Sequence, residues 1–191
     1  MFEMLTNILK FHGPQAKVVV RAHNSHIGNA QATEIGRRGE FNIGQLCLEN
    51  FGNESYRIGF GTNDGTVTAA SNWDAPMQVM SIRPAHAQSY ERLFHLTNSP
   101  GLLLPLKEQG SSSLRNKLLK PRLERAIGVI YRPDSELSSH YFEAVLPRQF
   151  DEYIWIDRTR SVKPLDVAEL QGLPDTPIRS VSENIRIAGT R

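Results

Sequence analysis

The sequence predicts an α/β fold in which a mainly parallel sheet is flanked by helices. Along the chain, short apolar and β-branched runs alternate with segments of helical periodicity, an order typical of a parallel sheet with helices on its faces. The chain has 191 residues, of which 39% are hydrophobic and 22% charged. This length and composition suit one globular domain with a sizeable core.

The N-terminal part predicts a helix, a strand, a loop and a second helix, in that order. An apolar stripe at helical spacing covers residues 2–11 and ends before Gly13-Pro14. The β-branched run at residues 18–22 predicts the first buried strand, and the segment 24–40, with its glycines, predicts a loop. Asn42 is placed to cap a helix that ends at Gly52.

The remaining chain predicts the rest of the sheet. We expect strands at residues 56–61, 66–70, 77–82, 102–106, 126–131, 140–145 and 153–157, and helices at residues 89–96 and 114–119. Asp64-Gly65 is a strong hairpin-turn signal between the first two of these strands. Residues 166–191 are polar and aperiodic, so we expect a disordered tail after a domain of residues 1–165.

Composition and charge argue against several classes of protein. The net charge is only +2, and the basic residues are scattered without interleaved aromatic residues, which disfavours a nucleic-acid groove. No apolar run approaches the ~18 residues of a membrane span, and no signal peptide is visible. One cysteine excludes an internal disulfide. We therefore expect a cytoplasmic protein with neither a nucleic acid nor a membrane as its partner.

Two imidazoles directly after the first predicted strand are the strongest functional signal. His23 and His26 stand three residues apart, shortly before Gly28. Ligands of open α/β sheets bind where strands end, and a neutral histidine accepts and returns protons near pH 7. The pair therefore favours a site in which one ring activates water and the other orients or polarises the substrate. The alternative is two loop histidines hydrogen-bonded to the backbone.

Other chemistries fit the spacing less well. Glu34 or His140 would give zinc a third ligand, but no spacing rule selects either and no H-E-x-x-H pattern is present, so we expect no metal and no other cofactor. The sequence has neither a P-loop nor a G-x-S-x-G elbow. Ser139 and His140 are neighbours on a predicted strand and so point to opposite faces. His140 can face the same site as His23, and Trp73 can line that site from a loop.

Several ordered blocks of residues resemble the erythromycin esterase family. Among them are His23-Asn24-Ser25-His26-Ile27-Gly28, Asn42-Ile43-Gly44-Gln45-Leu46, Gly65-Thr66-Val67-Thr68-Ala69-Ala70, Arg122-Leu123-Glu124-Arg125-Ala126-Ile127-Gly128 and Pro147-Arg148-Gln149-Phe150-Asp151. The resemblance covers about residues 1–165. It implies an α/β hydrolase that opens macrolide lactones, an antibiotic-resistance activity, with water as the nucleophile and no obligatory metal.

The resemblance also implies roles for individual residues. His23 and His26 match the paired active-site histidines of the family. We expect Asn24, Glu34, Trp73 and His140 to contact the substrate, a small-molecule ester or lactone.

The same resemblance implies that part of the site lies outside this chain. Family members carry a Glu-x-x-His-Gly motif in an N-terminal half, which supplies the main general base, and Glu3 and His12 are not spaced to match it. Because a base must lie within hydrogen-bond reach of the attacking water, we expect little or no esterase activity from this chain alone. The alternatives are a non-catalytic interaction module that pairs with a separately encoded N-terminal half, and a metal-dependent hydrolase.

Overall fold

The computed structural model describes residues 1–107 and 112–163. The chain divides into two compact units, one made of Met1–Ala22 and Lys163–Arg191 and the other of His23–Val162. In the described part of the first unit, helix α1 (Phe2–His12) ends at Gly13, whose φ is +89°. The tail expected at residues 166–191 lies outside the described residues.

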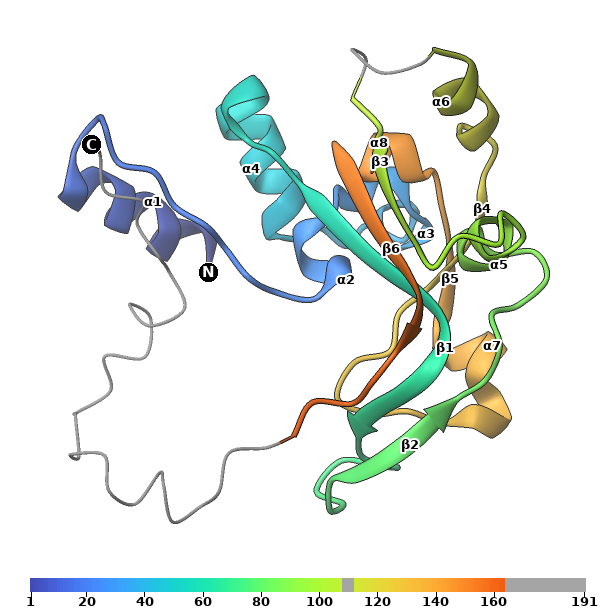
Figure 1. Ribbon diagram of the computed structural model, residues 1–191. Helices are drawn as coiled ribbons and strands as arrows, with labels where there is room; N and C mark the ends of the chain where they lie inside the picture. The colour runs from blue at the N-terminus through green and yellow to red at the C-terminus, as the bar shows by residue number, and fades with distance from the viewer. Residues whose placement is uncertain (108–111, 164–191) are drawn as a thin grey trace. The chain divides into compact units, whose positions relative to one another are not determined.

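The second unit is built on a four-stranded sheet in the order β2-β1-β6-β3 (Figure 1). These strands are β1 (Ile58–Ala69), β2 (Gln78–Ile82), β3 (Gly101–Pro105) and β6 (Glu152–Thr159). Strands β1 and β6 run parallel, whereas β2 pairs with β1, and β3 with β6, in antiparallel fashion. Strands β4 (Arg122–Arg125) and β5 (Tyr141–Ala144) form a separate antiparallel pair. The predicted α/β class is confirmed, but the larger sheet is mixed rather than mainly parallel.

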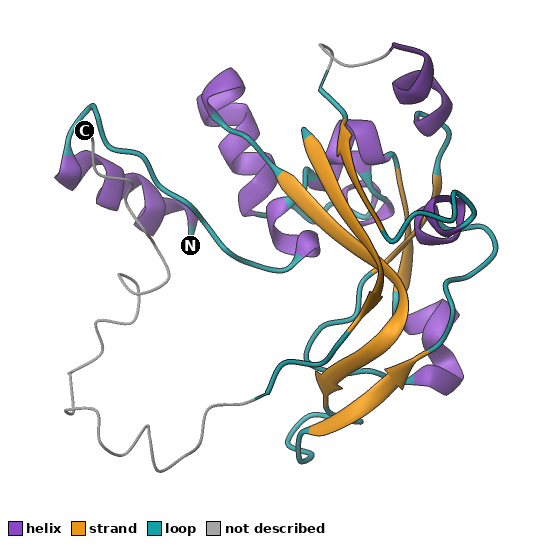
Figure 2. Ribbon diagram, viewed as in Figure 1, coloured by secondary structure: helices purple, strands orange, loops and turns teal. Residues whose placement is uncertain are grey.

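Short helices flank the larger sheet (Figure 2). They are α2 (Asn24–Ile27), α3 (Glu34–Arg37), α4 (Ile43–Phe51), α5 (Tyr90–His95), α6 (Ser112–Leu118), α7 (Glu136–Ser139) and α8 (Leu146–Gln149), with 3-10 turns at Ala30–Ala32, Gly52–Glu54 and Pro133–Ser135. Asn42 caps α4 as predicted, because its Oδ1 accepts a hydrogen bond from Gln45 N at 2.9 Å. None of the helices in the described ranges has both the length and the apolar character needed to cross a lipid bilayer.

The main core lies on one face of the larger sheet. Its buried side chains come from β3, β6 and the helices α5, α6 and α8, together with the segments next to them: Tyr90, Phe94, Leu104, Leu106, Leu118, Leu146, Phe150, Tyr153 and Trp155. The neighbouring positions on the strands point the other way, and Phe60, Leu103 and Ile156 are between 44% and 63% exposed. This alternation is the pattern of a sheet that has one covered face.

The first predicted strand is absent. Residues 18–22 form no strand; Val20 makes only an isolated bridge, and Val19 is more than half exposed. The segment belongs to the unit that does not contain the sheet. β-branched residues favour strands chiefly where a sheet surface is available for packing, and this segment does not join one. His23 and His26 therefore follow an irregular segment, and the predicted loop at residues 24–40 contains α2 and α3.

The predicted hairpin at Asp64-Gly65 is also wrong. Strand β1 runs without interruption from Ile58 to Ala69. Gly65 has a φ of +124°, and a Cβ there would collide with the carbonyl oxygen of Thr159 on β6. This glycine therefore bends a continuous strand instead of reversing it. Likewise, the strand expected at residues 126–131 is replaced by β4, which ends at Arg125.

Candidate active site

Helix α2 holds the two predicted histidines, and His23 is its N-cap. The Nδ1 atom of His23 accepts a hydrogen bond from Ser25 N at 3.2 Å and lies 2.9 Å from Ser25 Oγ. Its Nε2 atom lies 3.0 Å from the carbonyl oxygen of Ile127. Because a carbonyl oxygen only accepts, Nε2 carries the proton. Both ring nitrogens are thus engaged, which fixes the orientation of the His23 imidazole.

The two imidazoles differ in their surroundings. Burial lowers the pKa of His23 below its ordinary value of 6.5; the bond to Ile127 opposes this effect, and the positive charge that His26 can carry adds to it. The His23 ring is therefore neutral at pH 7. The His26 side chain is exposed, and the described residues offer it no hydrogen bond or ion pair. The structure accordingly provides one fixed neutral ring beside one ring that is open to solvent.

Asn24, between the two histidines, fastens α2 to the sheet. Its side chain is buried, and its Nδ2 donates to the carbonyl oxygen of Phe60 at 2.6 Å while its Oδ1 accepts from Phe60 N at 3.1 Å. Strand β2 pairs with β1 only from Gly65 onward, so Phe60 has no strand neighbour on this side in the described residues. The Asn24 amide supplies both hydrogen bonds that such a neighbour makes. It therefore positions α2 at the edge of β1.

Two buried carboxyl groups lie beneath α2, and the sequence analysis missed both. Glu124 Oε1 on β4 accepts a hydrogen bond from Asn24 Nδ2 at 3.2 Å, and Glu91 Oε1 on α5 accepts one from Arg125 N at 2.9 Å. The pKa of Glu124 is raised to about 8, chiefly by burial and then by the nearby Glu91, against the opposing effect of hydrogen bonds from Gln149 and Asn24. Burial also raises the pKa of Glu91. Isolated glutamates are normally exposed, so no sequence signal marks this pair.

Glu34 and Trp73 have surroundings of their own. Glu34 Oε1 pairs with Arg38 Nη2 at 2.8 Å at the end of its own helix, and its Oε2 accepts from Glu143 N at 3.0 Å, so Oε2 holds α3 and β5 together. Trp73 lies in a turn before β2 and is 74% exposed. Neither side chain shares a hydrogen bond with His23 or His26 in the described residues, and their contact with substrate stays a prediction.

His140 lies at the start of β5 and is buried. Its Nε2 accepts a hydrogen bond from Arg132 N at 2.8 Å, and its ring packs on Tyr131 with centroids 5.4 Å apart. Burial lowers its pKa. The ring is thus a hydrogen-bonded part of the β4–β5 side of the unit, and its role toward a substrate also stays a prediction.

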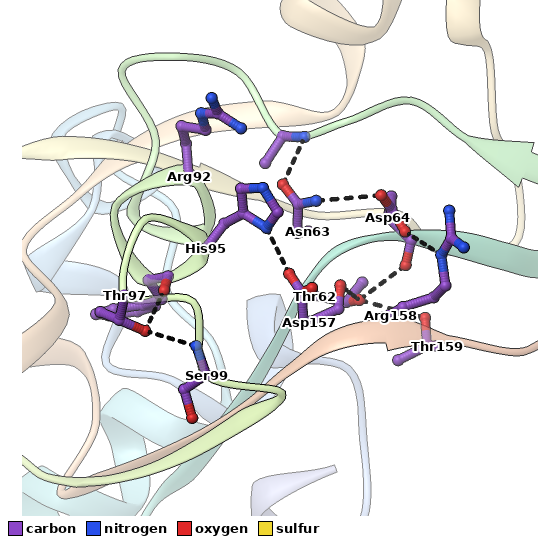
Figure 3. Close-up of polar contacts among 12 residues, drawn as sticks. Thr62, Asn63, Asp64, Arg92, His95, Thr97, Ser99, Asp157, Arg158 and Thr159 are labelled. Atoms are coloured by element: carbon purple, nitrogen blue, oxygen red, sulfur yellow. Dashed lines mark hydrogen bonds and ion pairs between the residues drawn. The ribbon is translucent and has the colours of Figure 1, made fainter.

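A second polar cluster lies where α5 meets β1 and β6 (Figure 3). His95 Nδ1 and Asp157 Oδ1 are 2.6 Å apart, and each side chain is about one-third exposed. Asp64 and Arg158 form a neighbouring ion pair at 2.7 Å. A carboxylate that holds Nδ1–H leaves Nε2 as an acceptor, the arrangement of an oriented base. His95 and Asp157 are 62 positions apart in the chain, so no sequence pattern indicates this dyad.

The surface of the second unit has shallow depressions away from α2. One is lined by Asp64, Gly65 and Arg158, another by Asn72, Tyr131 and Arg132, and neither includes His23 or His26. Within residues 1–107 and 112–163, no three His, Cys, Asp or Glu side chains converge as metal ligands.

Three solved structures share this fold. They are a succinoglycan biosynthesis protein (23% identity, TM-score 0.57), a protein from Bacillus cereus (17%, 0.59) and a mutant of the erythromycin esterase EreC in its open conformation (18%, 0.52). The similarity covers 73%, 72% and 82% of this chain but only 32%, 32% and 35% of those chains. This chain therefore spans about a third of the length of these proteins. They define its class as an α/β fold of the erythromycin-esterase type.

The sequence identifies the family itself. Residues 1–159 match the model of the erythromycin esterase family, so the chain belongs to that family. The resemblance inferred from the His23–Gly28 block and its companions is confirmed. Family membership supports an esterase-like hydrolase.

Proposed function

We propose that this chain is the histidine-bearing part of a cytoplasmic hydrolase that opens carboxylic esters or macrolide lactones, and so contributes to macrolide resistance. The observation that supports this function best is the pair on α2: a fixed, neutral His23 next to an exposed His26 with no partner in the described residues. A substrate or a water molecule can reach only the second ring without breaking hydrogen bonds.

The proposed reaction divides the work between the two rings. Water attacks the ester carbonyl carbon while a general base outside this chain takes its proton, and His26 orients the tetrahedral adduct and relays that proton to the alkoxide that leaves, giving a carboxylic acid and an alcohol. His23 keeps α2 in place through Ser25 and Ile127. The main general base belongs, in this proposal, to a polypeptide outside this chain, so the chain alone is weakly active or inactive.

The uncovered face of the sheet supports a second wall for the site. Phe60, Ile154 and Leu103 stand opposite one another on β1, β6 and β3, and they form an apolar row across this face. Exposed apolar rows of this kind are typical of protein interfaces. Because Asn24 is bonded to the backbone of Phe60, a polypeptide that covers the row also borders α2.

The test measures lactone opening by two preparations. The full chain is assayed alone and after co-expression with the part of the Bacillus cereus protein to which this chain has no counterpart. The substrate is erythromycin, and mass spectrometry detects the product that has gained one water. We expect near-background hydrolysis by the chain alone and clear hydrolysis by the pair. His26→Ala abolishes this activity, and His12→Ala, a control on α1, leaves it unchanged.

Other outcomes change the proposal in defined ways. Activity that survives His26→Ala but is lost in His95→Ala assigns the proton relay to the dyad of His95 and Asp157. The second candidate function is a non-catalytic interaction module, which the apolar row of Phe60, Ile154 and Leu103 favours. A stable complex of the two polypeptides without any hydrolysis supports that module. If the two polypeptides form no complex and show no hydrolysis, both functions are contradicted.

A further inference from the structure

A buried polar cluster connects five elements beneath the two histidines. It consists of Asn24 on α2, Glu91 on α5, Glu124 on β4, Gln149 on α8 and Tyr153 on β6, and none of these residues is more than 8% exposed. Glu124 stands at its centre, because its Oε1 accepts a hydrogen bond from Asn24 and its charge interacts with Glu91 and Tyr153. We call this set the buried carboxyl cluster.

The two carboxyl groups of the cluster lack a cation of their own. The nearest guanidinium, that of Arg125, donates instead to the carbonyl oxygens of Arg83 and Asn63, both at 2.8 Å, and lies 3.3 Å from Glu136 Oε1. Oε2 of Glu91 and Oε2 of Glu124 have no hydrogen-bond partner among the described residues.

Of the remaining groups that face the carboxyl pair, Arg122 is charged and the tyrosines are neutral. Arg122 on β4 and the hydroxyl of Tyr90 on α5 complete its charged and titratable surroundings, and burial raises the pKa of Tyr90 to about 12. Burial also raises the pKa of Tyr153. A buried charge without a partner is costly, so burial beside Glu91 favours the protonated form of Glu124 in the folded protein.

We propose that protonated Glu124 is a positioning residue that holds Asn24 against β1 and thereby sets the place of His23 and His26. The catalytic meaning of this role rests on the proposed function, whereas the contact itself does not. When Glu124 loses its proton, a second negative charge forms beside Glu91 in a region closed to water. Such an uncompensated charge must be hydrated, and water enters only if the contacts between α2, α5 and β4 open.

The chain links this protonation directly to the histidines. The same Asn24 amide nitrogen donates to Glu124 Oε1 and to the Phe60 carbonyl oxygen. Asn24 is the residue between the His23 cap and the rest of α2. Because Glu124 titrates at about pH 8, the release of α2 falls in the weakly alkaline range.

NMR titration of the full chain tests this role. The side-chain amide of Asn24 and the imidazole signals of His23 and His26 are followed from pH 6 to 9.5. We expect the Asn24 and His23 signals to show an inflection near pH 8, well above the midpoint of an ordinary histidine. Glu124→Gln keeps the acceptor oxygen and removes this inflection. Glu91→Gln removes the neighbouring charge and therefore moves the inflection to lower pH.

Controls and an activity profile separate this role from general structure. Glu49→Gln, on the exposed side of α4, leaves the inflection unchanged. In the co-expressed pair, hydrolysis by the wild type is expected to fall about tenfold per pH unit above the inflection, whereas Glu124→Gln retains its rate.

The possible failures are distinguishable. A wild-type chain without the alkaline inflection, or an inflection that survives Glu124→Gln, overturns the positioning role. If Glu124→Gln does not fold, an unshifted midpoint in Glu91→Gln overturns it instead. If the inflection behaves as expected and no preparation hydrolyses the lactone, the positioning role stands and the proposed hydrolase function is what fails.

Discussion

At the scale of single residues, the candidate site combines side chains that sequence patterns reveal with others that they hide. Two histidines spaced by three residues before a glycine were visible as a pair, and the structure places both on α2. Their anchor, Glu124, was not visible, because its contact with Asn24 spans 100 positions and depends on how β4 lies beneath α2. Titratable residue types thus marked the exposed half of the site, whereas its buried half emerged only from tertiary packing.

Glu124 also predicts an unusual pH dependence of stability. Its pKa is raised in the folded chain to about 8 from an ordinary value of 4.5, so between these values the folded state binds more protons than the unfolded state. The free energy of unfolding therefore falls as pH rises through this window. The half-buried His23 and the buried His140 act in the opposite direction below pH 6.5, because their pKa values are lowered.

Comparison of two proteins isolates the carboxyl contribution. We expect Glu124→Gln to gain stability relative to the wild type as pH rises from 5 to 8, by on the order of 3 kcal/mol. Urea unfolding at several pH values, followed by circular dichroism, measures this difference. A difference between the two proteins that is constant with pH contradicts the raised pKa of Glu124.

At the scale of elements, local signals succeeded where they describe one segment and failed where they describe pairing. The cap at Asn42 and the stop at Gly52 gave both ends of α4, because each depends on its own neighbours in the chain. The predictions of a turn at Asp64-Gly65 and of a strand at residues 18–22 were wrong, because turns and strands both depend on the backbone that lies beside them in the fold. Beside Gly65 the backbone of β6 continues the sheet, and residues 18–22 pair with none of the strands in the described part of the chain.

The crossing of α2 and α4 gives an element-scale prediction. A Cβ at Gly44 on α4 would collide with the carbonyl oxygens of Ile27 and Gly28, at the end of α2. Backbone atoms cannot move aside as a side chain does. Although Gly→Ala within a helix normally stabilises by about 0.5–1 kcal/mol, we expect Gly44→Ala to destabilise the chain by about 2 kcal/mol.

Gly128 provides the matched control. It lies after β4, has no positive φ, and a Cβ there meets nothing within 4 Å. Gly128→Ala should therefore change the urea midpoint little. Equal effects of the two substitutions would show that Gly44 is not a point of close approach. The NMR signals of His23 and His26 should shift in Gly44→Ala alone, because only that change displaces α2.

At the scale of the whole second unit, one face of the larger sheet is packed against helices and the other face is partly exposed in the described residues. Tyr153 and Trp155 on β6 are fully buried beneath α5 and its neighbours, whereas Ile154 and Ile156, which alternate with them, are partly buried and exposed, respectively. The period-2 pattern of such strands predicts two different faces from sequence. The pattern does not identify the polypeptide that covers the second face, because it describes only the strands of this chain and not the surface that binds them.

This uncovered face predicts how the chain behaves in solution. Phe60 is 55% and Leu103 is 63% exposed, and burying the exposed part of each against another surface contributes roughly 1–2 kcal/mol. We therefore expect the isolated chain to self-associate through the row of Phe60, Ile154 and Leu103. The double substitution of Phe60→Thr with Leu103→Thr keeps the preference for strands and should weaken this association at least about tenfold. Sedimentation velocity over a range of concentrations measures the change. Val129→Thr alters an equally exposed residue outside the sheet and should leave the association intact. Unchanged association in the double variant would place the contact on another surface.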